Sequence, residues 1–449
     1  MTDTKDALGR TLSRRSLLSR TALLSAGLAS SSTVLAACGG GSSGGPGGTS
    51  GGGGGGGGGG TVSWGSWANP GEAERFRAYN KMYTEKTGAK VTWQNVVGDY
   101  ASKMLTQLSG GSAPDAFYVG DTLISKAIES NVLAELGTDP AIKAVYDATF
   151  PGLRKWAESA DGKIYGVDVD CNPKVFWFNK KMLADAGVTQ DPAAAFEAGT
   201  WNMNTLTDML SKVKATGKRG MAMEAGWGDL FSYITTFGGT VFDDSGKAVF
   251  DTDPKAQMVI EWLLEQIKSE NITFAGSLPK GQGVDALFYS GQLATIQYGR
   301  WILPNLRKLK GKVEYDIAPL PSEDGKTVMP VAVYTACMSV NAKAKDPAAA
   351  KKFVADYCAA EGQKFRLSGG GNAVPSIAGL DEIVTEGNDP VHGKYFIDVA
   401  AKGYAVPLPL IRSAKKATDF PLKNDVLLKD VKNQTPKGYA GTLVKLLNG

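Results

Sequence analysis

An α/β fold is predicted for most of this 449-residue chain. Short runs of β-branched and aromatic residues alternate with amphipathic helical patterns, which is typical of βα units arranged around a parallel sheet. The pattern begins at Thr61, and its first elements are predicted in the order β-α-β-α-β. Residues 39–60 are almost entirely glycine with a few Ser, Pro and Thr. Because such a segment cannot bury a core, the folded body is expected to span 61–449.

The first elements of the body have clear start and stop signals. Residues 61–67 are predicted as the first strand because they are rich in β-branched and aromatic types. Asn69 then stands three residues before Glu72, which is the spacing of a capping box, and Gly88 is expected to end the helix that begins there. The pattern continues with a strand at 89–96, a helix at 99–108 and a strand at 116–119.

A second group of elements follows after residue 160. Strands are predicted at 164–167 and 175–178, and the second of them leads directly into a helix over 180–186. Further helices are predicted to begin near Trp201 and at Asp253. The sequence has no internal repeat, and no hydrophobic stretch after residue 60 is long enough to span a membrane.

The N-terminus predicts export and a lipid anchor. Arg14 and Arg15 precede an apolar run that is too short to span a membrane, so residues 1–37 are interpreted as a signal peptide. The arginine pair resembles a twin-arginine signal, while an ordinary secretory signal fits the same residues. Cys38 follows lipobox-like residues and is the predicted lipidation site, so that residues 38–60 form a lipid-anchored linker. We expect an extracytoplasmic body attached to the cell membrane.

Composition and charge exclude several function classes. Residues 1–37 contain five of the 49 Lys and Arg and two of the 45 Asp and Glu, so the body is almost neutral. A nucleic-acid partner is not expected, because it requires clustered phosphate contacts. The chain has one histidine, His392, and neither a Gly-x-Ser-x-Gly elbow nor a His-x-x-x-His pair. We therefore predict no catalytic residue, no metal and no cofactor.

Five segments in order along the body resemble those of one protein family. They are 176–180 with 186–187, 200–201, 288–301, 318–321 and 371–375. The third segment has the pattern Phe-x-x-Gly-x-x-Ala followed by Gly-Arg-Trp. Together, and behind the predicted lipidation site, the segments resemble the family-1 extracellular solute-binding proteins, the relatives of maltose-binding protein. The resemblance covers nearly the whole body.

The resemblance implies a two-lobed fold of the type II periplasmic binding proteins, in which two α/β lobes are joined by hinge strands. By analogy, the first lobe is 61–168 plus 336–377 and the second lobe is 169–335 plus 378–449. The hinges fall near 167–172, 331–337 and 374–379. Cys171 and Cys337 lie at two of these hinges, so a disulfide between them is possible and is left open. Together with Cys358 they make an odd number of cysteines after lipidation, so at least one thiol is free.

The same resemblance implies that the protein binds a carbohydrate between its lobes and delivers it to permease subunits of an ABC importer, as a monomer and without covalent chemistry. Three alternatives stay open. A secreted glycoside hydrolase needs only paired carboxylates and no local motif. The second alternative is a binding protein for a non-sugar solute, such as a polyamine or a phosphorylated polyol. Arg300 supplies a basic group for a phosphorylated polyol. A surface adhesion or sensor protein with this fold is the third.

Candidate ligand contacts are aromatic, carboxylate and amide side chains at strand ends and hinges. A sugar ring has an apolar face that aromatic rings cover, and hydroxyl groups that carboxylates and amides bind. Open α/β sheets present ligand contacts at their strand ends. By resemblance, Trp301 matches a position whose ring stacks on sugar, and Asp121 and Asp170 match carboxylate positions. The other candidates are Trp67, Trp227 and Tyr298, followed in second rank by Tyr118, Tyr334 and Asn372.

Overall fold

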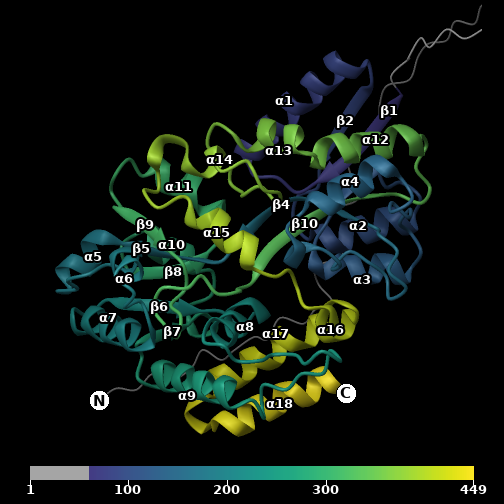
Figure 1. The fold of residues 1–449 in the computed structure, drawn as a ribbon. Helices are drawn as coiled ribbons and strands as arrows, with labels where there is room; N and C mark the ends of the chain where they lie inside the picture. Colours follow the sequence, from purple (N-terminus) through teal and green to yellow (C-terminus); the bar gives the residue numbers. More distant parts are fainter. Residues whose placement is uncertain (1–59) are drawn as a thin grey trace, which may run out of the picture. The chain divides into compact units, whose positions relative to one another are not determined.

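The computed structural model describes residues 60–449; the predicted signal peptide, Cys38 and the linker up to residue 59 lie outside the described residues. The body contains two five-stranded mixed sheets flanked by helices, which confirms the predicted α/β class and its two lobes (Figure 1). We call the first sheet with its helices the first lobe, and the second sheet with its helices the second lobe. None of the helices in this described part is long and apolar enough to cross a membrane.

The first sheet has the strand order β2-β1-β3-β10-β4, and the second has the order β7-β6-β8-β5-β9. Parallel pairs join β1 to β2 and β3, and β6 to β7 and β8, whereas β10 and β5 run antiparallel to their neighbours. The strands are β1 (Thr61–Ser66), β2 (Lys90–Asn95), β3 (Ala116–Val119), β4 (Val167–Pro173), β5 (Val175–Asn179), β6 (Arg219–Met223), β7 (Ile272–Phe274), β8 (Leu293–Tyr298), β9 (Tyr315–Ala318) and β10 (Val333–Val340).

Helices cover both faces of the first sheet. On one face, Trp64 of β1 packs against Phe76 and Tyr357, with ring centroids 5.2 and 5.3 Å away. On the other face, Phe117 of β3 belongs to the same apolar cluster as Met104. The helices of this lobe are α1 (Pro70–Thr87), α2 (Tyr100–Ser109), α3 (Asp121–Glu129), α4 (Pro140–Ala148), α12 (Pro347–Cys358) and α13 (Ala360–Leu367), with the short 3-10 helix η1 (Pro151–Leu153).

The predicted ends of the first helix are confirmed. The Asn69 side chain accepts a hydrogen bond from the Glu72 backbone N–H at 2.9 Å, and the Glu72 carboxylate accepts one from the Asn69 N–H at 2.8 Å. Gly88 ends the helix with φ 72°, a left-handed conformation that glycine adopts without a Cβ penalty. The order β1-α1-β2-α2-β3 agrees with the prediction because these signals are local.

The second lobe contains the remaining helices, and its last ones touch the first lobe. Helices α16 and α17 contact α3, and the Ser125 hydroxyl on α3 donates to the Ile411 carbonyl. The helices are α5 (Lys180–Asp185), α6 (Pro192–Glu197), α7 (Met203–Ala215), α8 (Trp227–Thr236), α9 (Pro254–Lys268), α10 (Val284–Tyr289), α11 (Leu303–Lys308), α14 (Glu382–Thr385), α15 (Tyr395–Lys402), α16 (Leu408–Ile411), α17 (Ala414–Lys429) and α18 (Pro436–Asn448). Its 3-10 helices are η2 (Ala275–Ser277), η3 (Arg300–Ile302), η4 (Glu386–Asn388) and η5 (Val431–Asn433).

The chain passes between the sheets at three places. Strand β4 pairs with β10 as far as Pro173, and Lys174 leads directly into β5 of the other sheet. The first sheet therefore includes 169–173 and 333–335, which the predicted boundaries place in the second lobe. The second passage runs from β9 to β10, and the third runs from α13 to α14, where Val374 pairs with Cys171. The predicted strand at 164–167 is wrong except for its last residue, because Ile164 makes only an isolated bridge and β4 begins at Val167.

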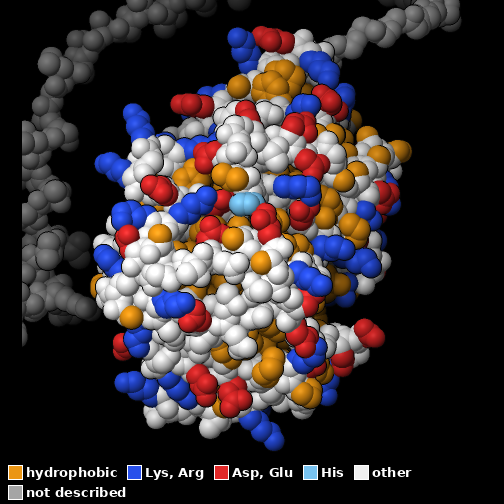
Figure 2. Space-filling model, turned by 60° about the vertical axis from the view of Figure 1, so that its left-hand side comes forward, with side chains coloured by type: hydrophobic (Ala, Val, Ile, Leu, Met, Phe, Trp, Pro, Cys, Tyr) orange, Lys and Arg blue, Asp and Glu red, His pale blue; other side chains and the backbone are white. Residues whose placement is uncertain are grey.

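The surface of the body mixes charges of both signs. On the face that Figure 2 shows, Lys and Arg side chains are interspersed with Asp and Glu side chains. Among the ion pairs of the body, many join residues one helical turn apart, as for Lys181 and Asp185 at 2.7 Å. This distribution agrees with the near-neutral balance of the body.

Candidate ligand-binding cleft

A cavity of about 470 Å³ opens where the first lobe meets the start of α8. Its walls come from the N-terminal ends of α2 and α3, the start of α8 and the first residues of β10. Strand ends and helix starts meet here because β1 and β3 run parallel and finish at the same edge of the sheet. The lining residues are Trp67, Gly98, Asp99, Tyr100, Ala101, Gly120, Asp121, Thr122, Leu123, Trp156, Trp227, Val333, Tyr334, Thr335 and Val406.

Aromatic rings from both lobes line this cavity. Trp67, which follows β1, packs edge-on against Tyr100 with ring centroids 4.9 Å apart. Trp227, the first residue of α8, lies 5.7 Å from Tyr334 of β10. The structure thus brings together three of the predicted aromatic contacts, Trp67, Trp227 and Tyr334, although the last two are 107 positions apart in the sequence.

The aromatic surface continues from Tyr334 toward η3. Trp301 lies 5.9 Å from Tyr334, and Tyr298 lies 5.3 Å from Trp301. The Tyr298 hydroxyl donates to the Glu224 carboxylate at 2.9 Å. Glu224 was not among the predicted contacts, although it directly follows β6 and the strand-end argument applied to it as well. Tyr298 and Trp301 do not line the 470 Å³ cavity, but they extend its aromatic wall.

Asp121 occupies the start of α3, directly after β3 and Gly120. Burial raises the pKa of its carboxyl, and hydrogen bonds from the Trp227 side chain and the Thr122 backbone oppose this increase. None of the ion pairs among residues 60–449 includes Asp121. Asp121 is therefore a carboxylate that lines the cavity without a cationic partner.

A second carboxyl group lies directly behind the cavity wall. Asp168 on β4 is 4% exposed and accepts hydrogen bonds from the Trp156 indole at 2.9 Å and the Thr335 hydroxyl at 2.8 Å, both of which line the cavity. Burial raises the pKa of Asp168 to about 7. Sequence reasoning did not single out Asp168 or Trp156, because nothing local to either residue indicates that they meet.

An ion pair is buried on the far side of Tyr334. Lys174, the residue between β4 and β5, pairs with Asp229 of α8, and both side chains are less than 5% exposed. The Lys174 ammonium lies 5.6 Å from the centroid of the Tyr334 ring. Burial lowers the pKa of Lys174 to about 8. This pair ties the first passage between the lobes to the helix that carries Trp227.

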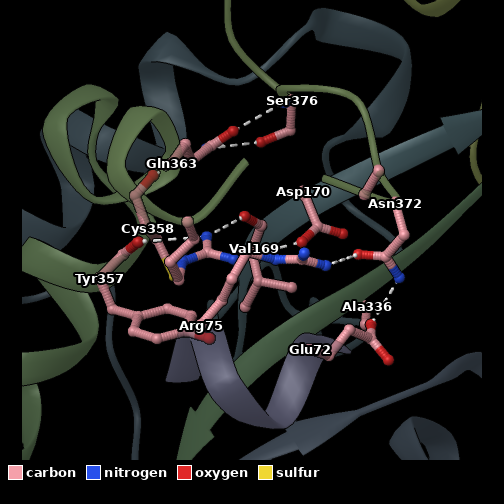
Figure 3. Close-up of polar contacts among 12 residues, drawn as sticks. Glu72, Arg75, Val169, Asp170, Ala336, Tyr357, Cys358, Gln363, Asn372 and Ser376 are labelled. Carbon is pink, nitrogen blue, oxygen red and sulfur yellow. Dashed lines mark hydrogen bonds and ion pairs between the residues drawn. The ribbon is translucent and has the colours of Figure 1, made fainter. Parts of the chain in front are cut away.

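Asp170 and Asn372, two predicted contacts, belong to a polar network outside this cavity (Figure 3). Asp170 pairs with Arg366 at 3.3 Å, and the buried Arg366 also donates to the Val169 carbonyl at 2.6 Å. The Asn372 amide donates to Glu72 at 2.7 Å and accepts from Arg75 at 3.0 Å. Cys171 comes next on β4, and its thiol donates a hydrogen bond to the Pro375 carbonyl.

Tyr118 lies in the core of the first lobe and is 4% exposed, so its predicted role as a ligand contact is not supported by its position. Its hydroxyl shares a 2.6 Å hydrogen bond with the Tyr357 hydroxyl. Along β3, Ala116 and Tyr118 face one apolar cluster, and Phe117 and Val119 face the other. The period-two alternation of a strand therefore directs the phenol away from the cavity edge.

Arg300 and the cysteines have structural surroundings. Arg300 is completely buried and donates to the carbonyls of Ala373 at 2.9 Å and Ile383 at 3.0 Å. Its terminal nitrogens are thus engaged by backbone oxygens, which removes the observation that favoured a phosphorylated solute. Cys171, Cys337 and Cys358, the three cysteines within residues 60–449, are buried free thiols, so the first two form no disulfide in this structure.

Comparison with known proteins gives a family and a set of similar folds. A family model described as bacterial extracellular solute-binding protein matches residues 65–364. A maltodextrin-binding protein of Bacillus subtilis is 25% identical over 238 residues, which is 49% of this chain and 51% of that protein. An arabinooligosaccharide-binding protein of the same species is 24% identical over 262 residues, 56% and 57% of the two chains. The chain spans about half the length of these curated relatives.

Solved structures share the architecture. An ABC substrate-binding protein from Listeria monocytogenes, in complex with cycloalternan, has a TM-score of 0.71 at 20% identity and covers 87% of this chain and 98% of its own. The GacH receptor of Streptomyces glaucescens, solved unliganded and with acarbose, has a TM-score of 0.69 at 19% identity with the same coverage. These similarities confirm the two-lobed, type II binding-protein fold expected from the sequence.

Proposed function

This chain belongs to the bacterial extracellular solute-binding protein family, and we propose that it holds a carbohydrate in the cavity between its lobes. The observation that carries the proposal is a cavity lined by indole rings from both lobes and by a carboxylate that has no ionic partner among the described residues. Trp67 and Trp156 come from the first lobe, Trp227 comes from the second, and Asp121 supplies the carboxylate. Aromatic rings cover the apolar face of a sugar, and a carboxylate accepts its hydroxyl hydrogens. The proteins similar to this chain are named for oligosaccharides, which supports the same solute class.

The proposed mechanism is capture and closure without covalent chemistry. A solute that touches Trp67 in the first lobe and Trp227 in the second favours the arrangement in which both rings reach it, because only differential contacts shift such an equilibrium. The passages at Lys174, at the start of β10 and at Val374 are the segments about which the lobes rotate. Tyr298, Trp301 and Glu224 then provide a second contact surface for the further rings of a longer saccharide.

The proposal extends to delivery. The closed protein hands its solute to permease subunits of an ABC importer as a monomer, and Cys38 carries the lipid that keeps it at the outer face of the cell membrane. Residues 1–37 direct export through the twin-arginine or the general secretory route, and residues 38–60 form the tether. Labelling with a radioactive fatty acid tests the anchor: incorporation that Cys38→Ser abolishes supports it, and unchanged incorporation contradicts it.

A ligand screen tests the function directly. The purified full chain is titrated with maltooligosaccharides, arabinooligosaccharides, polyamines and phosphorylated polyols, with tryptophan fluorescence and calorimetry as readouts. We expect saturable binding of an oligosaccharide that is recovered intact. Recovery of a cleaved sugar identifies a hydrolase instead, and binding of only a non-sugar solute overturns the carbohydrate assignment.

Matched tryptophan variants connect the binding to this cavity. Trp67→Ala removes one ring from the cavity wall and is expected to weaken saccharide binding by roughly 1–3 kcal/mol, which is about five- to 150-fold in affinity. Trp93→Ala is the control: this partly exposed indole is on β2 of the same lobe, donates to the Ser66 hydroxyl at 2.9 Å and does not line the cavity. Equal affinities of the two variants would place the solute elsewhere.

A further inference from the structure

The charged residues that line the proposed ligand cavity are all acidic. Two of its lining residues are acidic, Asp99 and Asp121, and none of the lining residues in the described chain is Lys or Arg. A third carboxyl, Asp168, lies directly behind Trp156 and Thr335. A carboxylate in such a site accepts hydroxyl hydrogens from a neutral sugar, but only a cationic group on the ligand also compensates its charge.

The two lining carboxylates differ in how much of their bonding capacity is used. Asp99 is exposed at the mouth of the cavity, where it caps α2 by accepting from the Ser102 hydroxyl at 2.7 Å and the Ser102 N–H at 3.2 Å. Asp121 is less exposed than Asp99, and none of the ion pairs in the described part of the chain includes it. Burying a carboxylate without a cation is unfavourable, so the ligand itself is the natural source of the compensating charge.

The buried cation Lys174 does not fill this role. Lys174 lies behind the Tyr334 ring, 5.6 Å from its centroid, and its side chain is 2% exposed. Its ammonium is already paired with Asp229. Lys174 therefore neutralises a carboxylate of α8 and leaves the one at the start of α3 uncompensated.

The aromatic lining suits a cation as well as a sugar face. Five aromatic side chains surround the cavity: Trp67, Tyr100, Trp156, Trp227 and Tyr334. The face of each ring carries negative potential, so several rings about one space attract an ammonium group, and the attraction is strongest where water is excluded. A cavity lined by both aromatic rings and carboxylates therefore favours a ligand that has an apolar surface and also carries a positive charge.

We infer that the solute is an amino sugar with a free, protonated amine, held by Asp121 beneath the aromatic rings. This inference rests on the proposed function and names its substrate class. The amine supplies the charge that Asp121 lacks, and the sugar ring supplies the apolar face that the indoles cover. Polyamines share the ammonium chemistry but present no sugar ring.

The experiment compares disaccharides that differ in one substituent. The full chain is titrated by calorimetry at about pH 6, below the ordinary pKa of an amine, with a β-linked glucosamine disaccharide, its N-acetylated form and the glucose disaccharide of the same linkage. Acetylation removes the charge and keeps the ring. We expect the free amine to bind roughly tenfold more tightly than either neutral form. Spermidine is the fourth ligand.

Variants assign the preference to one carboxylate. Asp121→Asn is expected to abolish the preference for the amine, because the amide has no charge with which to pair it. Asp139→Asn is the matched control: this aspartate also lies at a helix N-terminus of the first lobe, where it accepts from Ala141 and Ile142. Circular dichroism and urea unfolding confirm that both variants fold.

The outcomes separate this inference from the proposed function. Equal or tighter binding of the neutral disaccharides overturns the inference and leaves the carbohydrate proposal intact. An amine preference that survives Asp121→Asn also overturns it, since the charge is then recognised elsewhere. Binding of spermidine alone refutes both proposals, and binding of no saccharide in this set or in the wider screen refutes the proposed function itself.

Discussion

Replacing Asp168 by Asn should stabilise the protein near neutral pH. The carboxyl is 4% exposed, and one of its oxygens accepts both of its hydrogen bonds, from the Trp156 indole at 2.9 Å and the Thr335 hydroxyl at 2.8 Å. An asparagine places a carbonyl oxygen in the same position and keeps both bonds. What the substitution removes is the ability of the group to ionise inside the protein.

The magnitude follows from the difference between the folded and unfolded pKa values. Burial and, to a smaller extent, the nearby Asp170 raise the pKa of Asp168 to about 7, against the hydrogen bonds from Thr335 and Trp156. The unfolded carboxyl titrates near 3.9. The folded state therefore holds its proton more tightly, and stability falls as pH rises from about 4 to about 7. At about 1.4 kcal/mol for each pH unit, this group costs roughly 4 kcal/mol above neutrality.

The assay is urea unfolding of the wild type and Asp168→Asn at several pH values between about 4 and 8. We expect equal stability near pH 4 and a variant more stable by up to roughly 4 kcal/mol near pH 8. Asp115→Asn is a control that should change stability in the opposite direction. Burial raises the pKa of Asp115, but hydrogen bonds from Ser63 and Lys345 outweigh it and hold the pKa below its ordinary value. Its loss should therefore cost stability at neutral pH. Parallel stability profiles for wild type and Asp168→Asn would refute the reasoning.

Three further predictions concern the same framework. Gly228→Ala would place a Cβ against the Tyr334 hydroxyl and should weaken binding of the solute roughly tenfold or more. Gly226→Ala, whose Cβ meets nothing within 4 Å, should leave the affinity unchanged. Equal affinities of the two variants would contradict this arrangement. Arg366→Met removes the partner of Asp170 and should lower the free energy of unfolding by about 3–5 kcal/mol in urea, with a loss below about 1 kcal/mol as the contrary result. Burial raises the thiol pKa of Cys171, Cys337 and Cys358, so native protein should leave all three unmodified by Ellman's reagent and urea-unfolded protein should expose them; rapid native labelling would show that the structure opens at these positions.

Local features of this protein were determined by the sequence alone. The capping pair Asn69 and Glu72 and the terminating Gly88 fixed the first helix because their partners lie within one helical turn. The position of Asp121 directly after a buried strand predicted its place at the edge of the sheet, because parallel strands end together. The order of motifs from 176 to 375 predicted the two-lobed fold, which the solved structures confirm.

The composition of the cleft was decided by the tertiary structure. Asp168 meets Thr335 because β4 and β10 pair although 167 positions separate the two residues in the sequence, and Trp227 of α8 meets Tyr334 across 107 positions. Strand register, which no local signal sets, directed Tyr118 into the core and Asp170 toward Arg366. A sequence names the residue types that a ligand requires, but which of them share one cavity depends on long-range pairing and on which face of a strand each side chain occupies.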